Sequence, residues 1–278
     1  MNEVRKICVV TGTRAEYGIL SGLMKELQAN ANVCLQIIAT NMHLSPEFGL
    51  TYQEIEADGF VIDKKIEMLL SSDTQVGTVK SMGVALISLA DALSELNPDL
   101  ILILGDRYEM LSVASAATVM GIPIVHLHGG EITEGAYDDN IRHAITKLSY
   151  LHFTSTKEYR NNVIQMGESP DRVFWVGALG VDNILQEKIL SRKELSESLG
   201  IDLSEDFVVV TYHPVTKEPG KAESQINALL SSLEDIVNDY KIVFTLPNSD
   251  SDGRIIASMI RGWVEAHKDR AYAFPSLG

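Results

Sequence analysis

Residues 100–131, LILILGDRYEMLSVASAATVMGIPIVHLHGGE, decide the fold of this chain. The apolar run 100–104 is short and near-continuous, as a strand covered on both faces is, and it ends in a glycine-containing turn. A helical stretch at 108–120 follows, and a second apolar run at 122–127 leads into HLHGGE. Strand, turn, helix and strand in this order predict a βαβ unit of a parallel sheet.

The same alternation extends in both directions along the chain. Short runs rich in Val, Ile and Leu predict strands, and the amphipathic stretches between them predict helices. The predicted strands are 6–11, 33–40, 100–104, 122–127, 150–154 and 173–176, and the predicted helices include 18–28, 74–96, 108–120 and 157–166. The series is typical of an α/β fold with a parallel sheet and right-handed crossovers.

A second α/β series begins near residue 180. Ser191 and Glu194 have the spacing of a capping box, which opens a helix. Strands are predicted at 207–211 and 241–246 and helices at 223–237 and 254–267, so that only two strands are clear. We therefore expect two domains, residues 1–179 and 180–278, of which the second is abbreviated.

Three of the predicted strands end in turns that combine glycine with arginine or acid. The turns are 11–18, 105–107 and 126–131, and a second acidic and basic stretch follows the last of them at 138–143. Ligands gather at the carboxyl ends of parallel strands, where residues far apart in sequence converge. Each turn alone fits a solvated polar loop. Three turns with complementary residues favour a catalytic site.

Charge and motif content exclude several function classes. The net charge of −15 argues against nucleic acid as a partner, because such binding depends on cationic neutralisation of phosphates. An anionic substrate would need local positive charge, such as Arg14 or Arg107. No dinucleotide-binding glycine fingerprint follows the first strand. His126 and His128 would share a face in a strand, but no Cys/His spacing indicates zinc. We expect no cofactor and no metal.

Composition and the first residues indicate a cytoplasmic protein. The chain of 278 residues is 45% hydrophobic and 22% charged, which is ordinary for a globular protein. No apolar run approaches the ~20 residues that span a bilayer, and no secretory segment precedes the first strand. Cys8 and Cys34 lie in apolar runs, where we expect both to be buried and unpaired.

Five motifs together identify a family. They closely resemble the hydrolysing UDP-N-acetylglucosamine 2-epimerases of sialic and legionaminic acid type pathways, in order and at the family's spacing. The motifs are TGTRAEYG (11–18), GDR (105–107), HLHGGE (126–131), DDNIRHAITK (138–147) and HPV (213–215). The resemblance implies two Rossmann-like domains in a GT-B-like arrangement, with sugar chemistry in the first and nucleotide binding in the second. It also implies that the second domain is truncated, and that the protein is a homodimer or homotetramer.

The resemblance implies a reaction with proton transfer at C2 of the sugar. UDP is lost from C1, water adds to the unsaturated intermediate, and the free 2-epimer is released. Asp106 and Glu131 are the first candidates for acid and base, and Asp138 is a third. Arg142 would pair with a carboxylate or orient it, and His213 would protonate or bind the leaving UDP. Which carboxylate is acid and which is base stays open.

Each carboxylate also has a simpler interpretation. Asp106 would suit an N-cap of the helix that begins near Tyr108, and Asp138 or Asp139 would suit an N-cap of the helix that carries Arg142.

Five further residues are candidates for substrate binding. They are Arg14, Gly18, His43, Arg107 and Asn248. Arg14 lies near a helix N-terminus, where an anion is favoured, although a salt bridge with Glu16 is its alternative. A plain turn is the alternative for Asn248.

Three other functions stay open beside the hydrolysing epimerase. They are a non-hydrolysing epimerase, a GT-B glycosyltransferase and a non-catalytic fragment that binds nucleotide sugars. The non-hydrolysing branch typically has proline after the first arginine, whereas Ala15 follows Arg14 here. The sugar is either N-acetylglucosamine or a 2,4-diacetamido-trideoxy relative.

Overall fold

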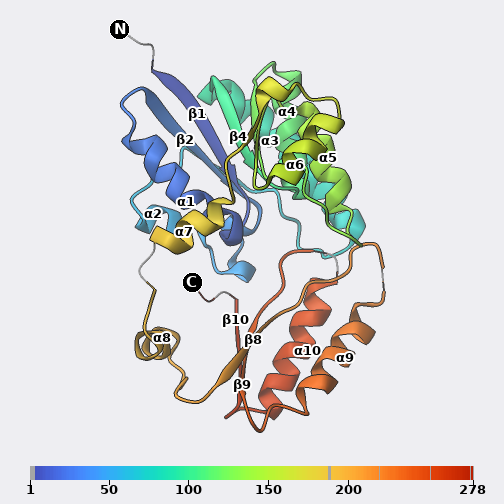
Figure 1. Ribbon diagram of the computed structural model, residues 1–278. Helices are drawn as coiled ribbons and strands as arrows, with labels where there is room; N and C mark the ends of the chain where they lie inside the picture. Colours follow the sequence, from blue (N-terminus) through green and yellow to red (C-terminus); the bar gives the residue numbers. More distant parts are fainter. Residues whose placement is uncertain (1–3, 187–188, 219, 251, 276, 278) are drawn as a thin grey trace. The chain divides into compact units, whose positions relative to one another are not determined.

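The computed structural model describes residues 4–186, 189–218, 220–250, 252–275 and 277 (Figure 1). The chain divides into two compact units. Unit 1 comprises Met1–Ser71 with Val76–Glu187, and unit 2 comprises Ser72–Gln75 with Lys188–Gly278.

Unit 1 is built on a parallel sheet of seven strands in the order β3-β2-β1-β4-β5-β6-β7. The strands are β1 (Arg5–Thr11), β2 (Val33–Thr40), β3 (Lys64–Ile66), β4 (Leu100–Leu104), β5 (Ile124–Leu127), β6 (Leu151–Thr154) and β7 (Val173–Trp175). The predicted parallel α/β sheet is confirmed. The edge strand β3 was not predicted, because its three residues include two lysines and form no apolar run.

The helices of unit 1 cover both faces of this sheet (Figure 1). They are α1 (Arg14–Ala29), α2 (Tyr52–Ala57), α3 (Gln75–Leu96), α4 (Tyr108–Val119), α5 (Asp138–Leu148), α6 (Lys157–Gln165) and α7 (Leu179–Gln186), with short 3-10 turns at Asn41–Leu44, Pro46–Phe48 and Pro170–Arg172. Alternate strand residues point to opposite cores. Cys8 and Ile101 pack under α3 and α4, whereas Val9 and Leu102 pack under α1. Each such buried aliphatic side chain contributes ~1.5–3 kcal/mol.

Helix α1 begins earlier than its apolar pattern indicates. Its N-cap is Thr13, whose side chain accepts a hydrogen bond from the backbone N–H of Glu16. The Glu16 carboxylate in turn accepts from the backbone N–H of Thr13, which completes a capping box. The helix therefore starts at Arg14, four residues before the predicted start at Gly18.

Helix α7 belongs to unit 1. The Asn183 side chain donates hydrogen bonds of 2.6 Å to the carbonyl oxygen of Gly18 and 3.1 Å to that of Ile19, both on α1. The structure thus places the division of the chain after α7 and not at the expected boundary of 179/180.

Unit 2 is a smaller parallel sheet with two helices packed against it. Its strands β8 (Phe207–Thr211), β9 (Lys241–Thr245) and β10 (Ala271–Phe274) lie in the order β10-β9-β8. The helices of this unit are α8 (Arg192–Leu199), α9 (Ala222–Leu233) and α10 (Gly253–Ala266). Ile226 of α9 and Ile256 of α10 pack in one cluster with Phe244 of β9. The expectation of only two clear strands was wrong, because the short β10 alternates small and aromatic residues.

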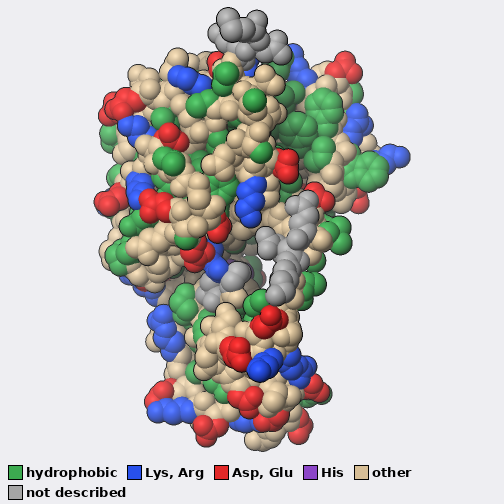
Figure 2. All heavy atoms as spheres, turned by 90° about the vertical axis from the view of Figure 1, so that its left-hand side faces the viewer, with side chains coloured by type: hydrophobic (Ala, Val, Ile, Leu, Met, Phe, Trp, Pro, Cys, Tyr) green, Lys and Arg blue, Asp and Glu red, His purple; other side chains and the backbone are tan. Residues whose placement is uncertain are grey.

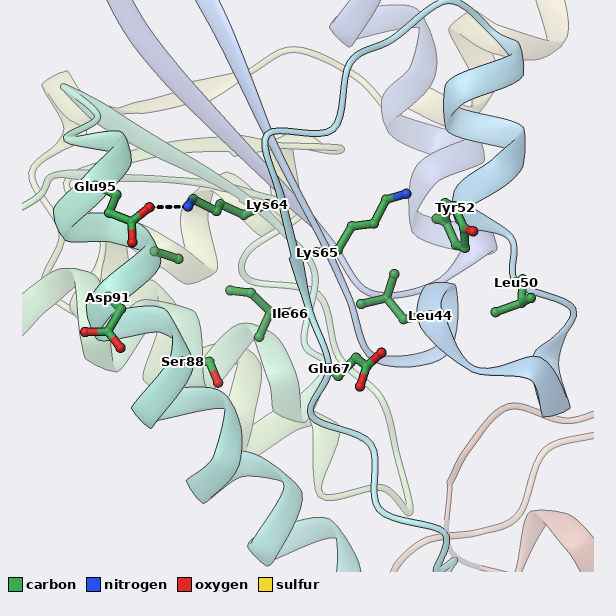
Figure 3. A pocket seen from close by; sticks show the side chains of 11 residues that line it. Leu44, Leu50, Tyr52, Lys64, Lys65, Ile66, Glu67, Ser88, Asp91 and Glu95 are labelled. Carbon is green, nitrogen blue, oxygen red and sulfur yellow. Dashed lines mark hydrogen bonds and ion pairs between the residues drawn. The ribbon is translucent and has the colours of Figure 1, made fainter.

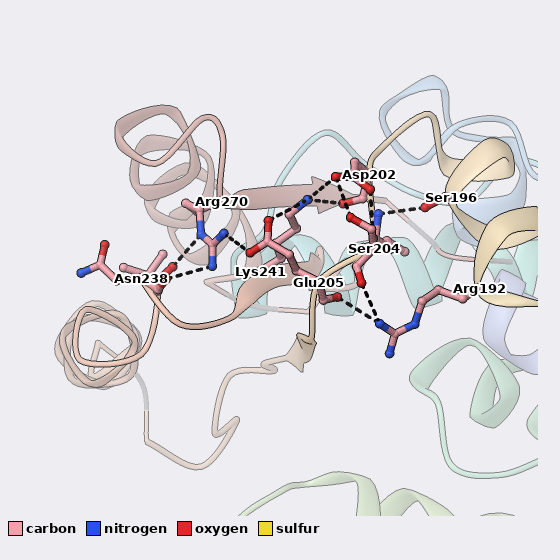
Figure 4. Close-up of polar contacts among 10 residues, drawn as sticks. Arg192, Ser196, Asp202, Ser204, Glu205, Asn238, Lys241 and Arg270 are labelled. Carbon is pink, nitrogen blue, oxygen red and sulfur yellow. Dashed lines mark hydrogen bonds and ion pairs between the residues drawn. The ribbon is translucent and has the colours of Figure 1, made fainter.

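A polar cluster fixes the amino end of β9 in unit 2 (Figure 4). Lys241 is 4% exposed, and its Nζ donates to the carbonyl oxygen of Asp202 at 2.6 Å and to its carboxylate at 3.0 Å. The backbone N–H of Ser204, and then Lys241, lower the pKa of Asp202 to about 2. Arg270 donates to Glu205 at 2.6 Å. Because the charges of this cluster are paired with one another, we assign the cluster a structural role.

Two expectations about single features are corrected. Cys8 is buried, but Cys34 is exposed, because only the last five residues of β2 are buried and Cys34 is its second residue. Helix α3 is long and apolar enough to cross a membrane by length and composition, with a mean hydropathy of 1.4 over 18 residues, so the earlier exclusion was too strong. One face of α3 packs into the core of unit 1 through Leu89 and Leu93. The cytoplasmic location stays a prediction.

Gly130, in the turn after β5, gives a test of this packing. Its φ is +80°, and a Cβ there would collide with the carbonyl oxygen of Tyr159 on α6. Gly121 has a φ of +71° with nothing near a Cβ. Gly121→Ala should therefore cost only the ~1–2 kcal/mol of the left-handed conformation. Gly130→Ala should lose ~1–3 kcal/mol more in the free energy of unfolding. Equal losses in denaturant unfolding would contradict the close approach of the turn to α6.

Candidate active site

The candidate site of unit 1 lies where β4, β5 and β6 end. The backbone N–H of Gly105 donates to Leu127 at 3.0 Å, and that of His128 donates to Phe153 at 2.9 Å. These bonds continue the sheet ladder past the strands and hold the three following turns side by side. Asp106, Glu131 and Ser155 are carried by these turns.

Arg142 on α5 joins the turns. Its side chain is 6% exposed. One terminal nitrogen, Nη2, donates to the Asp106 carboxylate and, at 2.9 Å, to Thr133 Oγ1. The other, Nη1, donates to the carbonyl oxygen of Glu131 at 2.8 Å and to Asp139 Oδ1 at 3.2 Å. A single guanidinium therefore contacts two candidate catalytic residues, one further loop residue and one residue in the first turn of α5.

Asp106 is turned toward Arg142 and does not cap α4. The N-cap of α4 is Arg107, which makes no side-chain capping bond. Burial raises the pKa of Asp106, against the lowering effects of the Arg142 and Arg107 guanidinium groups, and Glu131 raises it further. Burial and the two arginines therefore move the pKa of Asp106 in opposite directions, and the effect of burial is the larger.

Glu131 is held through one carboxylate oxygen. Ser155 Oγ donates to Glu131 Oε1 at 2.6 Å, and His128 Nδ1 lies 3.3 Å from the same oxygen. His128 has a φ of +62°, a left-handed conformation that costs ~1–2 kcal/mol outside glycine. Burial lowers the pKa of His128, and Glu131 partly opposes this. Ser155 was not singled out from the sequence, and His128 was considered only as half of a metal pair.

Asp138 and Asp139 begin α5, but neither is its N-cap. That position is Tyr137, with no side-chain capping bond, so the expected cap was wrong. Asp139 Oδ1 instead accepts from the backbone N–H of Thr133 at 3.0 Å and so closes the loop before the helix. Asp138 is half-buried in the first turn of α5.

His126 is a core residue beneath this site. It is fully buried, its Nε2 donates to the carbonyl oxygen of Gly105 at 2.7 Å, and its Nδ1 lies 3.1 Å from Thr146 Oγ1. Burial lowers its pKa to about 3, so the ring is neutral. With both ring nitrogens engaged, His126 offers no lone pair to a metal. In the described part of the chain, no group of three His, Cys, Asp or Glu side chains fits a metal ion.

Two buried acids, Glu16 of α1 and Glu109 of α4, lie beside the turn after β1. Glu16 accepts the backbone N–H groups of Gly12 and Thr13, and burial, followed by the Glu109 carboxylate, raises the pKa of Glu16 to about 8. Arg107 Nε donates to Glu109 Oε1 at 2.7 Å. Arg107 therefore lies beside the turn after β1, although it is 93 residues away from Arg14 in the sequence.

The other candidate residues of unit 1 are Arg14, His43 and Gly18. Arg14 is 23% exposed and pairs with Glu54 at 2.5 Å, and not with Glu16. His43 is fully buried between Thr11 Oγ1 at 3.0 Å and Thr51 Oγ1 at 2.8 Å, and burial lowers its pKa to about 4. Both ring nitrogens of His43 are thus engaged, and its imidazole packs against the buried side of the turn after β1. Gly18 lies on the exposed side of α1.

In unit 2, His213 and Asn248 lie at the same edge of the sheet. They follow β8 and β9, which are neighbouring parallel strands with Thr211 opposite Thr245. His213 is exposed and Asn248 is partly exposed. A Cβ on Gly253 would come within 2.6 Å of the carbonyl oxygen of Asn248, so glycine at this position lets the loop after β9 close onto α10.

A hollow of about 640 Å³ in unit 1 lies away from these residues (Figure 3). It opens beside β3 and contains none of the candidate side chains. Its two lysines are paired, Lys64 with Glu95 and Lys65 with Glu56, and Lys65 also lies 3.7 Å from the ring centre of Tyr52.

The surface charge is dispersed. On the face that Figure 2 shows, Asp and Glu side chains are interspersed with Lys and Arg, so the net charge of −15 does not gather in one field there.

Comparison with known proteins gives consistent matches. The sequence matches the UDP-N-acetylglucosamine 2-epimerase family over residues 25–278. A GDP/UDP-N,N'-diacetylbacillosamine 2-epimerase (hydrolyzing) of Campylobacter jejuni is 44% identical over 99% of this chain and 71% of its own length. A UDP-N,N'-diacetylbacillosamine 2-epimerase (hydrolyzing) of Legionella pneumophila is 37% identical over 96% of this chain and 70% of its own length.

A solved structure shows the same fold. The UDP-GlcNAc 2-epimerase of Methanocaldococcus jannaschii, in complex with UDP-GlcNAc and UDP, superposes with a TM-score of 0.78. It is 21% identical and covers 97% of this chain and 73% of the other, and at this identity the likeness concerns the fold alone.

Proposed function

The chain belongs to the UDP-N-acetylglucosamine 2-epimerase family, and we propose that it is a hydrolysing 2-epimerase of a UDP-linked 2-acetamido sugar. The family that its motifs resemble is thereby confirmed. The relatives with 44% and 37% identity are both named as hydrolysing enzymes. In the proposed reaction the substrate and one water give the free 2-epimer and UDP.

The observation that carries this proposal is that the guanidinium group of Arg142 contacts both Asp106 and Glu131. Arg142 contacts the Asp106 side chain and the Glu131 backbone, which sets the two residues at one site. Inversion at C2 needs a base on one face and an acid on the other. We assign Asp106 as the acid, because burial raises its pKa, and Glu131 as the base, because its carboxylate is partly exposed to a ligand. Asp138 is a second candidate for either proton transfer.

The sugar is proposed from the relatives. Those with 44% and 37% identity carry N,N'-diacetylbacillosamine in their names. We therefore place a UDP-linked 2,4-diacetamido sugar beside UDP-N-acetylglucosamine, and both belong in the assay.

Nucleotide binding is proposed for residues of each unit. In unit 1, Arg14 and Arg107 supply positive charge near the turn after β1, where Gly18 and the buried His43 shape the surface. In unit 2, His213 and Asn248 follow neighbouring strands, and the carboxyl edge of a parallel sheet is where such ligands bind.

The products decide between this function and its rivals. In D₂O, the proposed enzyme should release UDP together with a free 2-epimer that carries deuterium at C2. The reason is that the original C2 proton is removed and its replacement comes from a group that exchanges with the solvent. Product NMR with both sugar nucleotides measures this. A UDP-linked epimer at equilibrium would indicate the non-hydrolysing branch, and transfer of the sugar to an acceptor would indicate a glycosyltransferase. Binding without any product would indicate a non-catalytic fragment.

Two sets of variants separate chemistry from binding. Asp106→Asn and Glu131→Gln should lower turnover by ~10²-fold or more while UDP affinity is retained.

Arg14→Ala and His213→Ala should weaken UDP binding by roughly ten- to a hundred-fold, since a charged hydrogen bond contributes ~1.5–3 kcal/mol. Calorimetry with UDP and steady-state rates give the two measurements. Normal turnover in both carboxylate variants would remove them from the mechanism.

We further propose that the chain forms a homodimer or homotetramer. The outer face of α3 supports this, because Val76, Val79 and Ile87 are 63%, 67% and 74% exposed. Ile87→Glu should then lower the mass measured by light scattering. Val61→Glu, at a position 76% exposed outside α3, should leave the mass unchanged. The same mass for the parent and Ile87→Glu would contradict an interface at this face.

A further inference from the structure

The two carboxylate oxygens of Glu131 have different surroundings. Oε1 accepts a hydrogen bond from Ser155 Oγ at 2.6 Å and lies 3.3 Å from His128 Nδ1. Oε2 has no hydrogen-bond partner among the residues that the structure describes. The Glu131 side chain is 28% exposed, so the unpartnered oxygen is within reach of a ligand.

We propose that His128 and Ser155 are positioning residues that clamp Glu131 Oε1 and so make Oε2 the atom that takes the proton from the sugar. The proposal rests on the proposed epimerase function for the identity of that proton. The clamp itself rests on the contacts of three side chains.

The clamp is built from the ends of neighbouring strands. His128 directly follows β5, and its backbone N–H donates to Phe153 of β6 at 2.9 Å. Ser155 directly follows β6 and precedes Thr156, the N-cap of α6. The two donors are therefore fixed relative to each other by the sheet, before any side chain is considered.

The backbone of Glu131 is fixed independently. Arg142 Nη1 donates to its carbonyl oxygen at 2.8 Å. The preceding residue, Gly130, has its carbonyl oxygen bound by Asn162 of α6 at 2.9 Å. With the main chain held and one oxygen clamped, rotation of the carboxylate is restricted, and Oε2 keeps one orientation.

The tautomer of His128 follows from its surroundings. Burial favours the neutral ring, and the groups that face it are Glu131, Arg142 and Asp106. Nδ1 lies 3.3 Å from Glu131 Oε1, which can only accept, so the proposed clamp requires the single ring hydrogen on Nδ1. Nε2 is buried without a partner in the described part of the chain, which leaves a lone pair there and no N–H.

The proposed step balances with Oε2 as the base. The C2–H bond breaks and the proton forms a new O–H bond at Oε2. The C–H electron pair becomes the C1–C2 double bond, and the C1–O bond breaks so that UDP leaves with its electron pair. Oε1 accepts from Ser155 Oγ before and after this transfer, and His128 Nδ1 stays 3.3 Å from the same oxygen, so neither residue has to move. His128 acts through Glu131 and does not itself touch the sugar.

The tautomer can be measured without any activity. In protein labelled with ¹⁵N-histidine, the His128 signal, assigned by its loss in His128→Asn, should show hydrogen on Nδ1 at neutral pH. Glu131→Gln should lower the pKa of His128, because the carboxylate that raises it is removed. Hydrogen on Nε2 alone, or a pKa indifferent to Glu131, would overturn the clamp whatever reaction the protein catalyses.

Matched variants test the consequence for the reaction. His128→Asn retains a side-chain N–H donor and tolerates a positive φ, whereas His128→Gly relieves the φ and deletes the donor. Ser155→Thr retains the hydroxyl that Ser155→Ala removes. The Gly and Ala variants should lose about ten-fold or more in kcat with UDP affinity unchanged. The Asn and Thr variants should stay within about three-fold of the parent.

Two outcomes would overturn the positioning role. If His128→Asn were as slow as His128→Gly, retention of an N–H donor would not preserve the reaction, and positioning through that donor would be contradicted. If the Gly and Ala variants turned over normally, the clamp would not matter to the reaction. Absence of UDP release by the parent protein would instead defeat the proposed function, and the histidine spectra would still decide whether the clamp exists.

Discussion

The candidate site depends on one buried guanidinium. Arg142 is 6% exposed and contacts Asp106, Thr133, Asp139 and the backbone of Glu131. These partners come from the turn after β4, the loop after β5 and the first turn of α5. Removing one partner from a buried charge leaves it uncompensated, which is strongly destabilising. The loops that carry the carboxylates therefore form one network, and a change in one of them is felt by the others.

The sheet determines where this network lies. The loop after β5, which carries Gly129 to Glu131, packs against His126. The Nδ1 of His126 would be 3.0 Å from a Cβ on Gly129. The next residue, Gly130, is pressed against the backbone of α6. The loop thus passes over a buried imidazole on one side and a helix on the other. A Cβ would be tight at Gly129 and would collide with backbone at Gly130. Fold and candidate site consequently share residues, and the two glycines of the HLHGGE motif are needed for packing.

The elements and the site were predictable to different extents. Strands such as β4 are unambiguous because their apolar runs are bounded by turns, and the candidate carboxylates follow from where those strands end. β10 was missed because Ala-Tyr-Ala-Phe contains no such run. Ser155 was missed for another reason: its contact with Glu131 joins residues 24 apart, on turns whose closeness depends on strand order. The Glu54 partner of Arg14, 40 residues away, was hidden in the same way.

The first turn shows why an overall charge of −15 says little about local electrostatics. A helix N-terminus attracts an anion, and here Glu16 takes the backbone N–H groups that would bind one. Because its pKa is raised to about 8, the protonated form of Glu16 predominates at pH 7. A neutral Glu16 adds no negative charge beside Arg107, and the positive end of α1 stays uncompensated by it. Burial of Glu16 next to a second acid, Glu109, therefore leaves less negative charge beside Arg107 than the count of charges along the chain indicates, although the backbone N–H groups of the turn are already occupied.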